Sequence, residues 1–167
     1  MRIIIYLAGG CFWGIQGYFD LLKGVVSSQV GYANSKIENP SYELVCSGIT
    51  DAVEVVKITY EDEVLSLNEI LQRFFDIINP FALNYQGNDF GTQYRSGIYA
   101  KDSKILEKVR SFIQNLQKNF SQEIVTEVME LKNFYPAESY HQKYLAKNPN
   151  GYCHIDLSKA LQDNYIP

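Results

Sequence analysis

The chain has 167 residues, of which 46% are hydrophobic and 20% are charged, and its formal net charge is −4. This length and composition predict one globular domain with a hydrophobic core. The acidic balance argues against a surface that follows nucleic-acid phosphates, and no apolar run is long enough to span a membrane. Because the N-terminal apolar run is also too short for a signal peptide, we expect a cytoplasmic protein. Nothing in the sequence suggests an obligate partner, so we expect a monomer.

The first predicted strand, residues 2–7, leads into the stretch GGCFWG at residues 9–14, after which helical spacing begins. Cys11 is therefore expected at the start of a helix. There, unpaired backbone N–H groups and the positive end of the helix dipole lower the pKa of a thiol. Gly14 and Gly17 leave room for another group to approach the first turns of this helix closely.

Two aromatic residues, Phe12 and Trp13, follow the cysteine directly. Packing in the core is the simple interpretation of such residues. The alternative is that they form the wall of a pocket for a small, polarizable apolar group such as an S-methyl group. The sequence pattern leaves both interpretations open.

Two further strands are predicted at residues 25–33 and 52–60. In the second strand, alternation places Glu54 on the same face as the apolar Ala52, while Lys57 points the other way. A carboxyl group in apolar surroundings has a raised pKa and is suited to act as a general acid. The alternative is an edge-strand residue that reaches solvent.

The second half of the chain is predicted to contain three helices and two strands. A capping box, SLNE at residues 66–69, begins the first of these helices, and Pro136 is a favoured first residue for the last one. The predicted ranges are helices 66–78, 105–116 and 136–148, and strands 95–100 and 122–131.

The order of these elements indicates an α/β fold of two layers, in which helices cover a mixed, ferredoxin-like sheet. Residues 31–51 and 79–94 are long connections rich in Gly, Asn, Ser and Gln, and such loops commonly carry binding groups. In the second loop, Asp89 and Tyr94 are either a turn residue and a packed ring or hydrogen-bonding groups of a site.

The three cysteines, Cys11, Cys46 and Cys153, are too few and too widely spaced to indicate a disulfide scaffold. Together with His141 and His154 they contain no pair with the spacing of metal ligands, so we expect no metal. Core packing is the expected role of His141. His154 adjoins Cys153, but a sequence neighbour usually points elsewhere, so we assign it no role.

Five stretches of the sequence together resemble one protein family. GCFWG, NPSYELVCSG, QGNDFGTQYRSGIY, FYPAESYHQKYL and NPNGYC are similar, in this order, to the A-type peptide methionine sulfoxide reductases. The resemblance covers residues 5–153. It implies a ferredoxin-like core and the thiol-dependent reduction of methionine-S-sulfoxide, either free or in oxidised proteins, with no bound cofactor.

The resemblance also implies a role for each matched residue. Cys11 would attack the sulfoxide sulfur, and Phe12 and Trp13 would enclose the S-methyl group of the substrate. Glu54 would protonate the sulfoxide oxygen, which is a poor leaving group until it is protonated. Release of methionine would leave Cys11 as a sulfenic acid. The remaining substrate-binding residues would be Tyr42 and Tyr94, which hydrogen-bond the oxygen, and Asp89, which supports the site.

In the family, a second cysteine converts the sulfenic acid to a disulfide, which thioredoxin reduces. The matching residue is Cys153, in a turn-rich segment. We therefore predict one catalytic domain, residues 1–167, in which residues 149–167 form a mobile tail that carries the resolving cysteine. Cys46 is expected to be structural, with a backup resolving role as the lesser alternative.

The sequence departs from the family pattern at two places. Asn34 and Ser35 stand where the family usually has two glycines, and Asp51 and Ala52 replace the usual Gly-His before Glu54. Neither change removes a group assigned to the chemistry. Both bear on the conformation of the loops beside Glu54 and on the substrate preference.

Two other functions remain open at this stage. A peroxide-reducing thiol enzyme would use the same two cysteines, but it would not explain the aromatic pair or Glu54. A methionine-binding or redox-sensing module without turnover would not need the acid Glu54. The sulfoxide reductase and the peroxide-reducing enzyme differ in their substrate. The binding module differs from both because it would tolerate Glu54→Gln.

Overall fold

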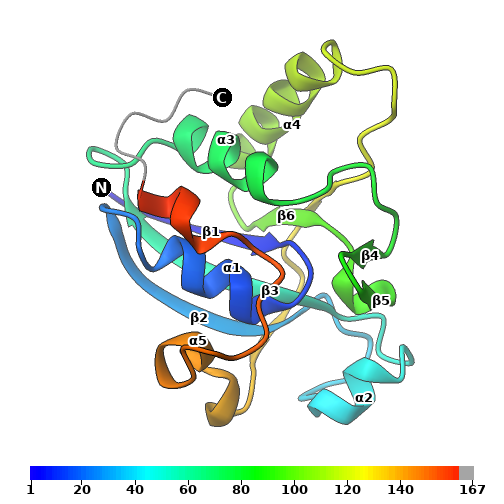
Figure 1. Cartoon of the computed structure of the whole chain (residues 1–167). Helices are drawn as coiled ribbons and strands as arrows, with labels where there is room; N and C mark the ends of the chain where they lie inside the picture. The colour runs from blue at the N-terminus through cyan, green and yellow to red at the C-terminus, as the bar shows by residue number, and fades with distance from the viewer. Residues whose placement is uncertain (162–167) are drawn as a thin grey trace.

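The computed structural model describes residues 1–161, and its centre is a six-stranded sheet of order β7-β6-β1-β3-β2-β8 (Figure 1). A separate two-stranded hairpin is formed by β4 and β5. The strands of the large sheet are β1 (Arg2–Ala8), β2 (Val25–Ala33), β3 (Val53–Glu61), β6 (Gly97–Ala100), β7 (Glu127–Glu130) and β8 (Phe134–Pro136), and those of the hairpin are β4 (Tyr85–Gln86) and β5 (Asp89–Phe90).

Two interlocked βαβ units form the middle of the sheet. Strands β1 and β2, which are joined through α1 (Phe12–Phe19), lie on either side of β3 and are antiparallel to it. Strands β3 and β6, joined through α3 (Leu67–Ile77) and the hairpin, lie in the same way on either side of β1. This is the predicted ferredoxin-like arrangement, extended at its two edges by β7 and β8.

The helices vary in length, and none in the described part of the chain is long and apolar enough to cross a membrane. Ser66 caps α3 as the sequence predicts, because its side chain accepts a hydrogen bond from the backbone N–H of Glu69 at 3.1 Å. The other helical segments are α2 (Tyr42–Cys46), α4 (Ser103–Gln117), α5 (Tyr144–Lys147) and the 3₁₀ turns η1 (Thr92–Tyr94), η2 (Ser139–His141) and η3 (Leu157–Leu161).

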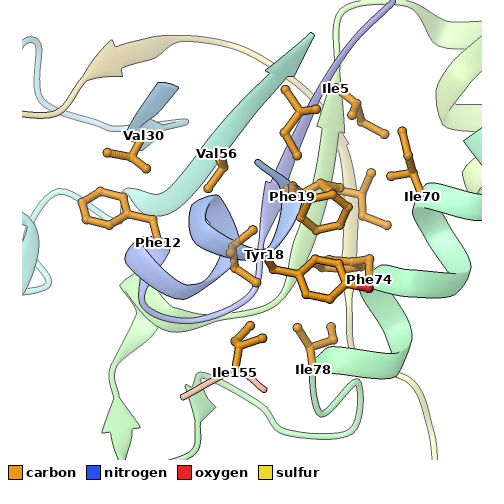
Figure 2. Close-up of a cluster of buried hydrophobic side chains, with 14 of the residues drawn as sticks. Ile5, Phe12, Tyr18, Phe19, Val30, Val56, Ile70, Phe74, Ile78 and Ile155 are labelled. Carbon is orange, nitrogen blue, oxygen red and sulfur yellow. The ribbon is translucent and has the colours of Figure 1, made fainter. Parts of the chain in front are cut away.

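The main core lies between the sheet and the helices α1, α3 and α4. Figure 2 shows Val56 of β3, Phe19 of α1 and Phe74 of α3 in this core, with Ile155 of the C-terminal segment at its margin. A smaller cluster on the opposite face includes Val53 of β3. Residues of β3 therefore alternate between two buried faces, which is expected for an interior strand.

The helix predicted from Pro136 to about 148 is wrong. Pro136 is instead the last residue of β8, and only residues 144–147 form an α-helix. The main reason is a tertiary contact: the side-chain amide of Gln142 accepts a hydrogen bond from the backbone N–H of Val30 and donates one to its C=O. Lys143 then takes a left-handed conformation, with φ of 55°, which cannot continue a helix.

One smaller expectation also changes. The last strand, predicted at residues 122–131, covers only Glu127–Glu130. The predicted tail, residues 149–167, lies partly outside the described residues, and its described part packs against the body of the protein. Ile155 and Ala160 are buried in the main core, and η3 contacts α1 (Figure 1). Apolar residues after Cys153 give the described part of this segment a place in the main core.

Candidate active site

Cys11 occupies the N-cap position of α1, directly after the turn that leaves β1. Gly10 in this turn has a φ of 87°, a left-handed conformation that costs other residues energy. The position agrees with the sequence prediction that a cysteine stands where the strand becomes a helix. Cys11 is largely enclosed, with 8% of its surface exposed.

Glu54 lies on β3 beside this turn, and only 2% of its surface is exposed. Its Oε1 accepts a hydrogen bond from the backbone N–H of Phe12 at 3.2 Å, so a free donor of the helix N-terminus meets the carboxyl group. The Oε2 atom is buried and has no hydrogen-bond partner among the described residues. An edge position that reaches solvent, the alternative for Glu54, is thus excluded by the interior location of β3.

The electrostatics of this pair differ from the sequence expectation in one respect. Burial raises the pKa of Glu54 to about 8, although the bond from Phe12 opposes the shift. Burial and the negative charge of Glu54 also raise the pKa of the Cys11 thiol, and the backbone hydrogen bond from Trp13 only partly offsets this. The helix N-terminus alone predicted a lowered thiol pKa. In the structure, desolvation is the larger effect, so at neutral pH both groups carry protons.

The aromatic residues after the cysteine take two different positions. Phe12 is buried against Tyr32 of β2, whereas Trp13 is partly exposed and stacks on Tyr144 of α5 with ring centroids 3.7 Å apart. The indole Nε1–H of Trp13 donates to Nδ1 of His141 at 3.1 Å. The imidazole of His141 lies 5.2 Å from the ring of Phe12. His141 is thus packed in the interior, as expected, but it also fixes the orientation of Trp13.

Tyr42 and Tyr94 come from two separate loops and meet close to Glu54. The Tyr42 hydroxyl is close enough to Tyr94 and to the thiol of Cys46 to affect the pKa of both. Burial raises the pKa of Tyr94, and the charge of Glu54 adds to this shift. Both phenols therefore keep their protons at neutral pH and remain hydrogen-bond donors beside the acid.

Asp89, on β5, closes another side of the site. Its charge contributes to raising the pKa of both Cys11 and Glu54. The carboxylate accepts a hydrogen bond from the Tyr152 hydroxyl at 2.9 Å, which connects the hairpin to the C-terminal segment. Asp89 therefore lies near both Cys11 and Glu54 and links the hairpin to the C-terminal segment.

Cys153 lies over the first turn of α1. A Cβ atom added at Gly14 would be 3.3 Å from Cys153 Sγ and 3.1 Å from the side chain of Ile155. The predicted purpose of this glycine is confirmed, because it lets the chain that carries the second thiol approach the helix closely. Cys153 is near enough to Cys11 for its charge to affect the Cys11 pKa. The structure contains both as free thiols.

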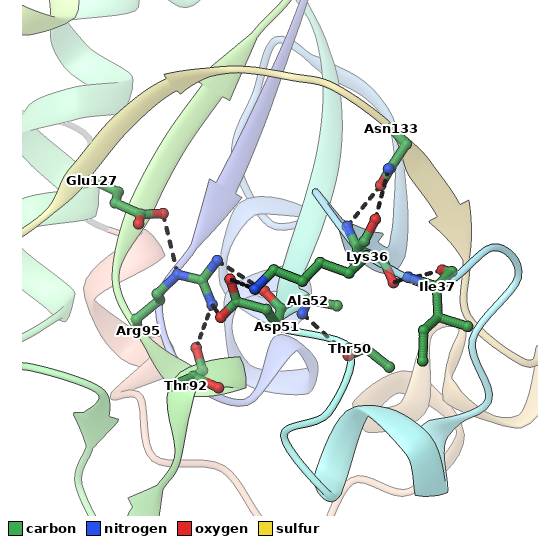
Figure 3. Close-up of polar contacts among 10 residues, drawn as sticks. Lys36, Ile37, Thr50, Asp51, Ala52, Thr92, Arg95, Glu127 and Asn133 are labelled. Carbon is green, nitrogen blue, oxygen red and sulfur yellow. Dashed lines mark hydrogen bonds and ion pairs between the residues drawn. The ribbon is translucent and has the colours of Figure 1, made fainter.

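Arg95 connects the η1 turn, which carries Tyr94, to the segment just before β3, which carries Glu54. Figure 3 shows its contacts with Thr92, Asp51 and Glu127. Its guanidinium donates to the backbone C=O groups of Thr92 and Asp51 at 2.8 and 3.1 Å, and to the carboxylate of Glu127 at 3.1 Å. The η1 turn, the start of β3 and the strand β7 are thereby fixed relative to one another.

The two departures from the family pattern share a backbone feature. Asn34 and Asp51, which stand where the resemblance leads us to expect glycine, have φ values of 52° and 54°. Asn and Asp are the residues other than glycine that adopt this conformation most readily. Asn34 is also held in place, since its side-chain oxygen accepts a hydrogen bond from the backbone N–H of Lys132 at 2.7 Å. The loops beside Glu54 thus keep a conformation that suits glycine.

All eight residues predicted for the site are brought together by contacts or mutual charge effects. The sequence analysis missed Glu138, whose carboxylate accepts from the Tyr32 hydroxyl and from the backbone N–H of Tyr42. It also missed the contacts of Tyr152 and His154. The stretches FYPAESYHQKYL and NPNGYC contain or adjoin these residues, but only the fold shows their partners.

Within residues 1–161 there is no group of three His, Cys, Asp or Glu side chains suited to hold a metal ion.

Comparison with known proteins gives one consistent result. The family model described as peptide methionine sulfoxide reductase matches residues 4–165. The peptide methionine sulfoxide reductase MsrA of Malacoplasma penetrans is 59% identical over 153 residues, which are 92% of this chain and 96% of that protein. The reduced form of Mxr1 from Saccharomyces cerevisiae is a similar solved structure, with a TM-score of 0.86, 41% identity, and coverage of 91% of this chain and 88% of that one. Mxr1 has also been solved in complex with Trx2, and that chain matches with a TM-score of 0.61 at 27% identity, over 86% of this chain and 84% of that one.

Proposed function

The chain belongs to the peptide methionine sulfoxide reductase family, so it is an oxidoreductase that reduces methionine sulfoxide, and we propose that Cys11 and Glu54 carry out the first chemical step. We further propose that the substrate is the S-epimer, free or in oxidised proteins. The observation that supports the roles of Cys11 and Glu54 most directly is their proximity: the thiol lies beside a buried carboxyl group that is protonated at neutral pH.

In the first step, Cys11 Sγ attacks the sulfoxide sulfur while Glu54 donates its proton to the sulfoxide oxygen. The bond formed between Cys11 Sγ and the substrate sulfur then breaks together with the substrate's S–O bond, so the oxygen is transferred to Cys11 and methionine leaves. The thiol proton of Cys11 replaces the proton that Glu54 gave up, so Cys11 S–H and the sulfoxide become Cys11 S–OH, a sulfenic acid, and methionine. Glu54 is suited to this step because its Oε2 is buried without a partner and is free to meet the sulfoxide oxygen.

Four side chains fix the substrate relative to this pair. Trp13, oriented by its hydrogen bond to His141, provides an aromatic surface for the S-methyl group together with Phe12. The phenol groups of Tyr42 and Tyr94 donate hydrogen bonds to the sulfoxide oxygen, where negative charge develops as the thiol attacks.

In the second step, Cys153 attacks the sulfenic sulfur of Cys11, which gives a Cys11–Cys153 disulfide and one water molecule. The disulfide is then reduced by the two thiols of a thioredoxin, so that both cysteines return to the thiol form. The position of Cys153 over Gly14 supports this assignment, and the Mxr1–Trx2 complex supports the kind of reductant.

The decisive experiment is a single turnover with separate S- and R-epimers of a methionine sulfoxide peptide, with free thiols counted before and after. We expect methionine from the S-epimer alone, together with the loss of two thiols. The Cys11→Ser variant should give no methionine. The Cys153→Ser variant should give methionine in the first turnover but form no Cys11–Cys153 disulfide. Absence of methionine with both epimers would overturn the proposed function.

A further inference from the structure

His154, directly after Cys153, inserts its ring against the turn before Cys11 and the first turn of α1, which are far from it in the sequence. Its Nε2 lies 2.8 Å from the backbone C=O of Gly9, in the turn before Cys11. A Cβ atom added at Gly10 would be 2.9 Å from Nε2, and one added at Gly14 would be 3.3 Å from Nδ1. The imidazole is therefore seated in a recess that is open because these positions carry no side chain.

The hydrogen bond to Gly9 determines which nitrogen of His154 carries the proton. A carbonyl oxygen only accepts, so Nε2 must be the donor in this bond. Nδ1 is buried and has no hydrogen-bond partner among the described residues. Because the ring is enclosed and donates through Nε2 alone, its orientation depends on a single hydrogen bond to the turn of the nucleophile.

This arrangement determines where Cys153 lies. Nδ1 of His154 and Sγ of Cys153 are both 3.3 Å from the point where a Cβ at Gly14 would be. Ile155, the residue after His154, is buried in the main core with 6% of its surface exposed. Its backbone C=O accepts a hydrogen bond from the Cys153 thiol at 3.2 Å. The segment is thus anchored by an apolar contact at Ile155 and by a polar contact at His154 (Figure 2 shows Ile155).

We propose that His154 is a positioning residue for the resolving step: its Nε2–H bond to the Gly9 carbonyl holds Cys153 over the first turn of α1, within reach of Cys11. This rests on the proposed function. In that step Cys153 S–H and Cys11 S–OH give the disulfide and water, with Cys153 oxidised and the sulfenic sulfur reduced. The earlier attack of Cys11 on the sulfoxide does not involve His154.

The test compares the two steps in one rapid-quench single turnover, by following methionine formation and the Cys11–Cys153 disulfide separately. The variants are His154→Leu, which fills the recess without a donor, and His154→Gln, whose amide reaches Gly9 as Nε2 does. We expect His154→Leu to form methionine at the wild-type rate and to form the disulfide about tenfold more slowly, the effect of one lost hydrogen bond. His154→Gln should restore most of the disulfide rate.

His154→Asn is a second variant in case His154→Leu fails to fold, because its side chain is polar but too short to reach Gly9, and it should be slow like His154→Leu. Wild-type rates of disulfide formation in a folded His154→Leu or His154→Asn protein would overturn the proposal. Equal slowing of both steps would also overturn it, since that would mean general loss of structure. Failure of the wild-type protein to form methionine would instead contradict the proposed function.

Discussion

The backbone N–H of Phe12 donates a hydrogen bond to Oε1 of Glu54 at 3.2 Å, so the first residue of α1 is tied to an interior strand of the sheet. This contact places the carboxyl group of Glu54, the proposed acid, beside Cys11, the proposed nucleophile, which directly precedes Phe12. It also occupies one carboxyl oxygen and leaves the other without a protein partner among the described residues. The carboxyl group and the thiol are therefore placed next to each other by a backbone hydrogen bond.

Replacing Glu54 by Gln should reduce kcat for sulfoxide reduction at least about 100-fold, because an amide cannot supply the proton. In the wild-type protein, the rate should fall as the pH rises past about 8, where Glu54 loses its proton. Steady-state kinetics between pH 6 and about 10 measure both effects. Glu107→Gln, an exposed change on α4, is the control. Normal turnover by Glu54→Gln at neutral pH would exclude Glu54 as the acid.

Glu54 should also make the stability of the protein depend on pH. Its pKa rises from the model-peptide value of 4.5 to about 8 on folding, so the folded state binds more protons than the unfolded state between these values. The free energy of unfolding therefore decreases with rising pH across this window and stays level above it. Urea unfolding at several pH values should show Glu54→Gln gaining stability relative to the wild type from pH 5 to about 8. A difference that is constant with pH would contradict the raised pKa.

Two substitutions on one helix separate the role of Gly14 from helix propensity. Gly14→Ala places a methyl group 3.1 to 3.3 Å from Ile155, Cys153 and His154, whereas Gly17→Ala meets only Leu145 that closely. Both changes favour the helix by about 0.5–1 kcal/mol. We expect Gly14→Ala alone to slow disulfide formation after a normal first methionine, measured by thiol counting. Equal disulfide rates in both variants would contradict a close approach of Cys153 to this turn.

Arg95→Met should lower both the stability of the protein and its catalytic efficiency. The side chain is 14% exposed and donates to Thr92, Asp51 and Glu127, so its loss leaves acceptors without partners. We expect the free energy of unfolding to fall by about 2–3 kcal/mol, with lower kcat/KM because Tyr94 and Glu54 are no longer held together. Arg110→Met, which removes an exposed arginine from α4, should change stability by less than about 0.5 kcal/mol. Chemical denaturation of both variants measures the difference.

His141→Phe should raise KM for the sulfoxide severalfold, because it keeps a ring in the cluster but removes the acceptor for Trp13 Nε1–H. His141→Asn is the matched comparison, since its side-chain oxygen can accept the same hydrogen bond. KM close to the wild-type value in His141→Asn, with a raised KM in His141→Phe, would show that the hydrogen bond orients the indole. An unchanged KM in both would mean that ring packing alone holds Trp13.

Much of the fold followed from patterns that depend on neighbouring residues only. The alternation of β3 placed Glu54 on a buried face, and the capping box at Ser66 marked the start of α3. The glycines around Cys11 indicated a close approach at this turn. These features have short-range physical causes, namely side-chain direction in a strand, free N–H groups at a helix end, and the space left by a missing Cβ.

Other features were decided by residues far apart in the sequence. Gln142 satisfies the backbone of Val30 from 112 residues away, and this contact helps to replace the predicted helix after Pro136 by a strand and turns. The pKa of Cys11 reverses for a similar reason: the helix N-terminus alone lowers it, but burial and Glu54, brought near only by folding, raise it more. The sequence by itself determined which chemical groups the protein contains and which local elements carry them. Only the tertiary structure decided their solvation and partners, because desolvation and hydrogen bonding depend on what the rest of the chain places around each group.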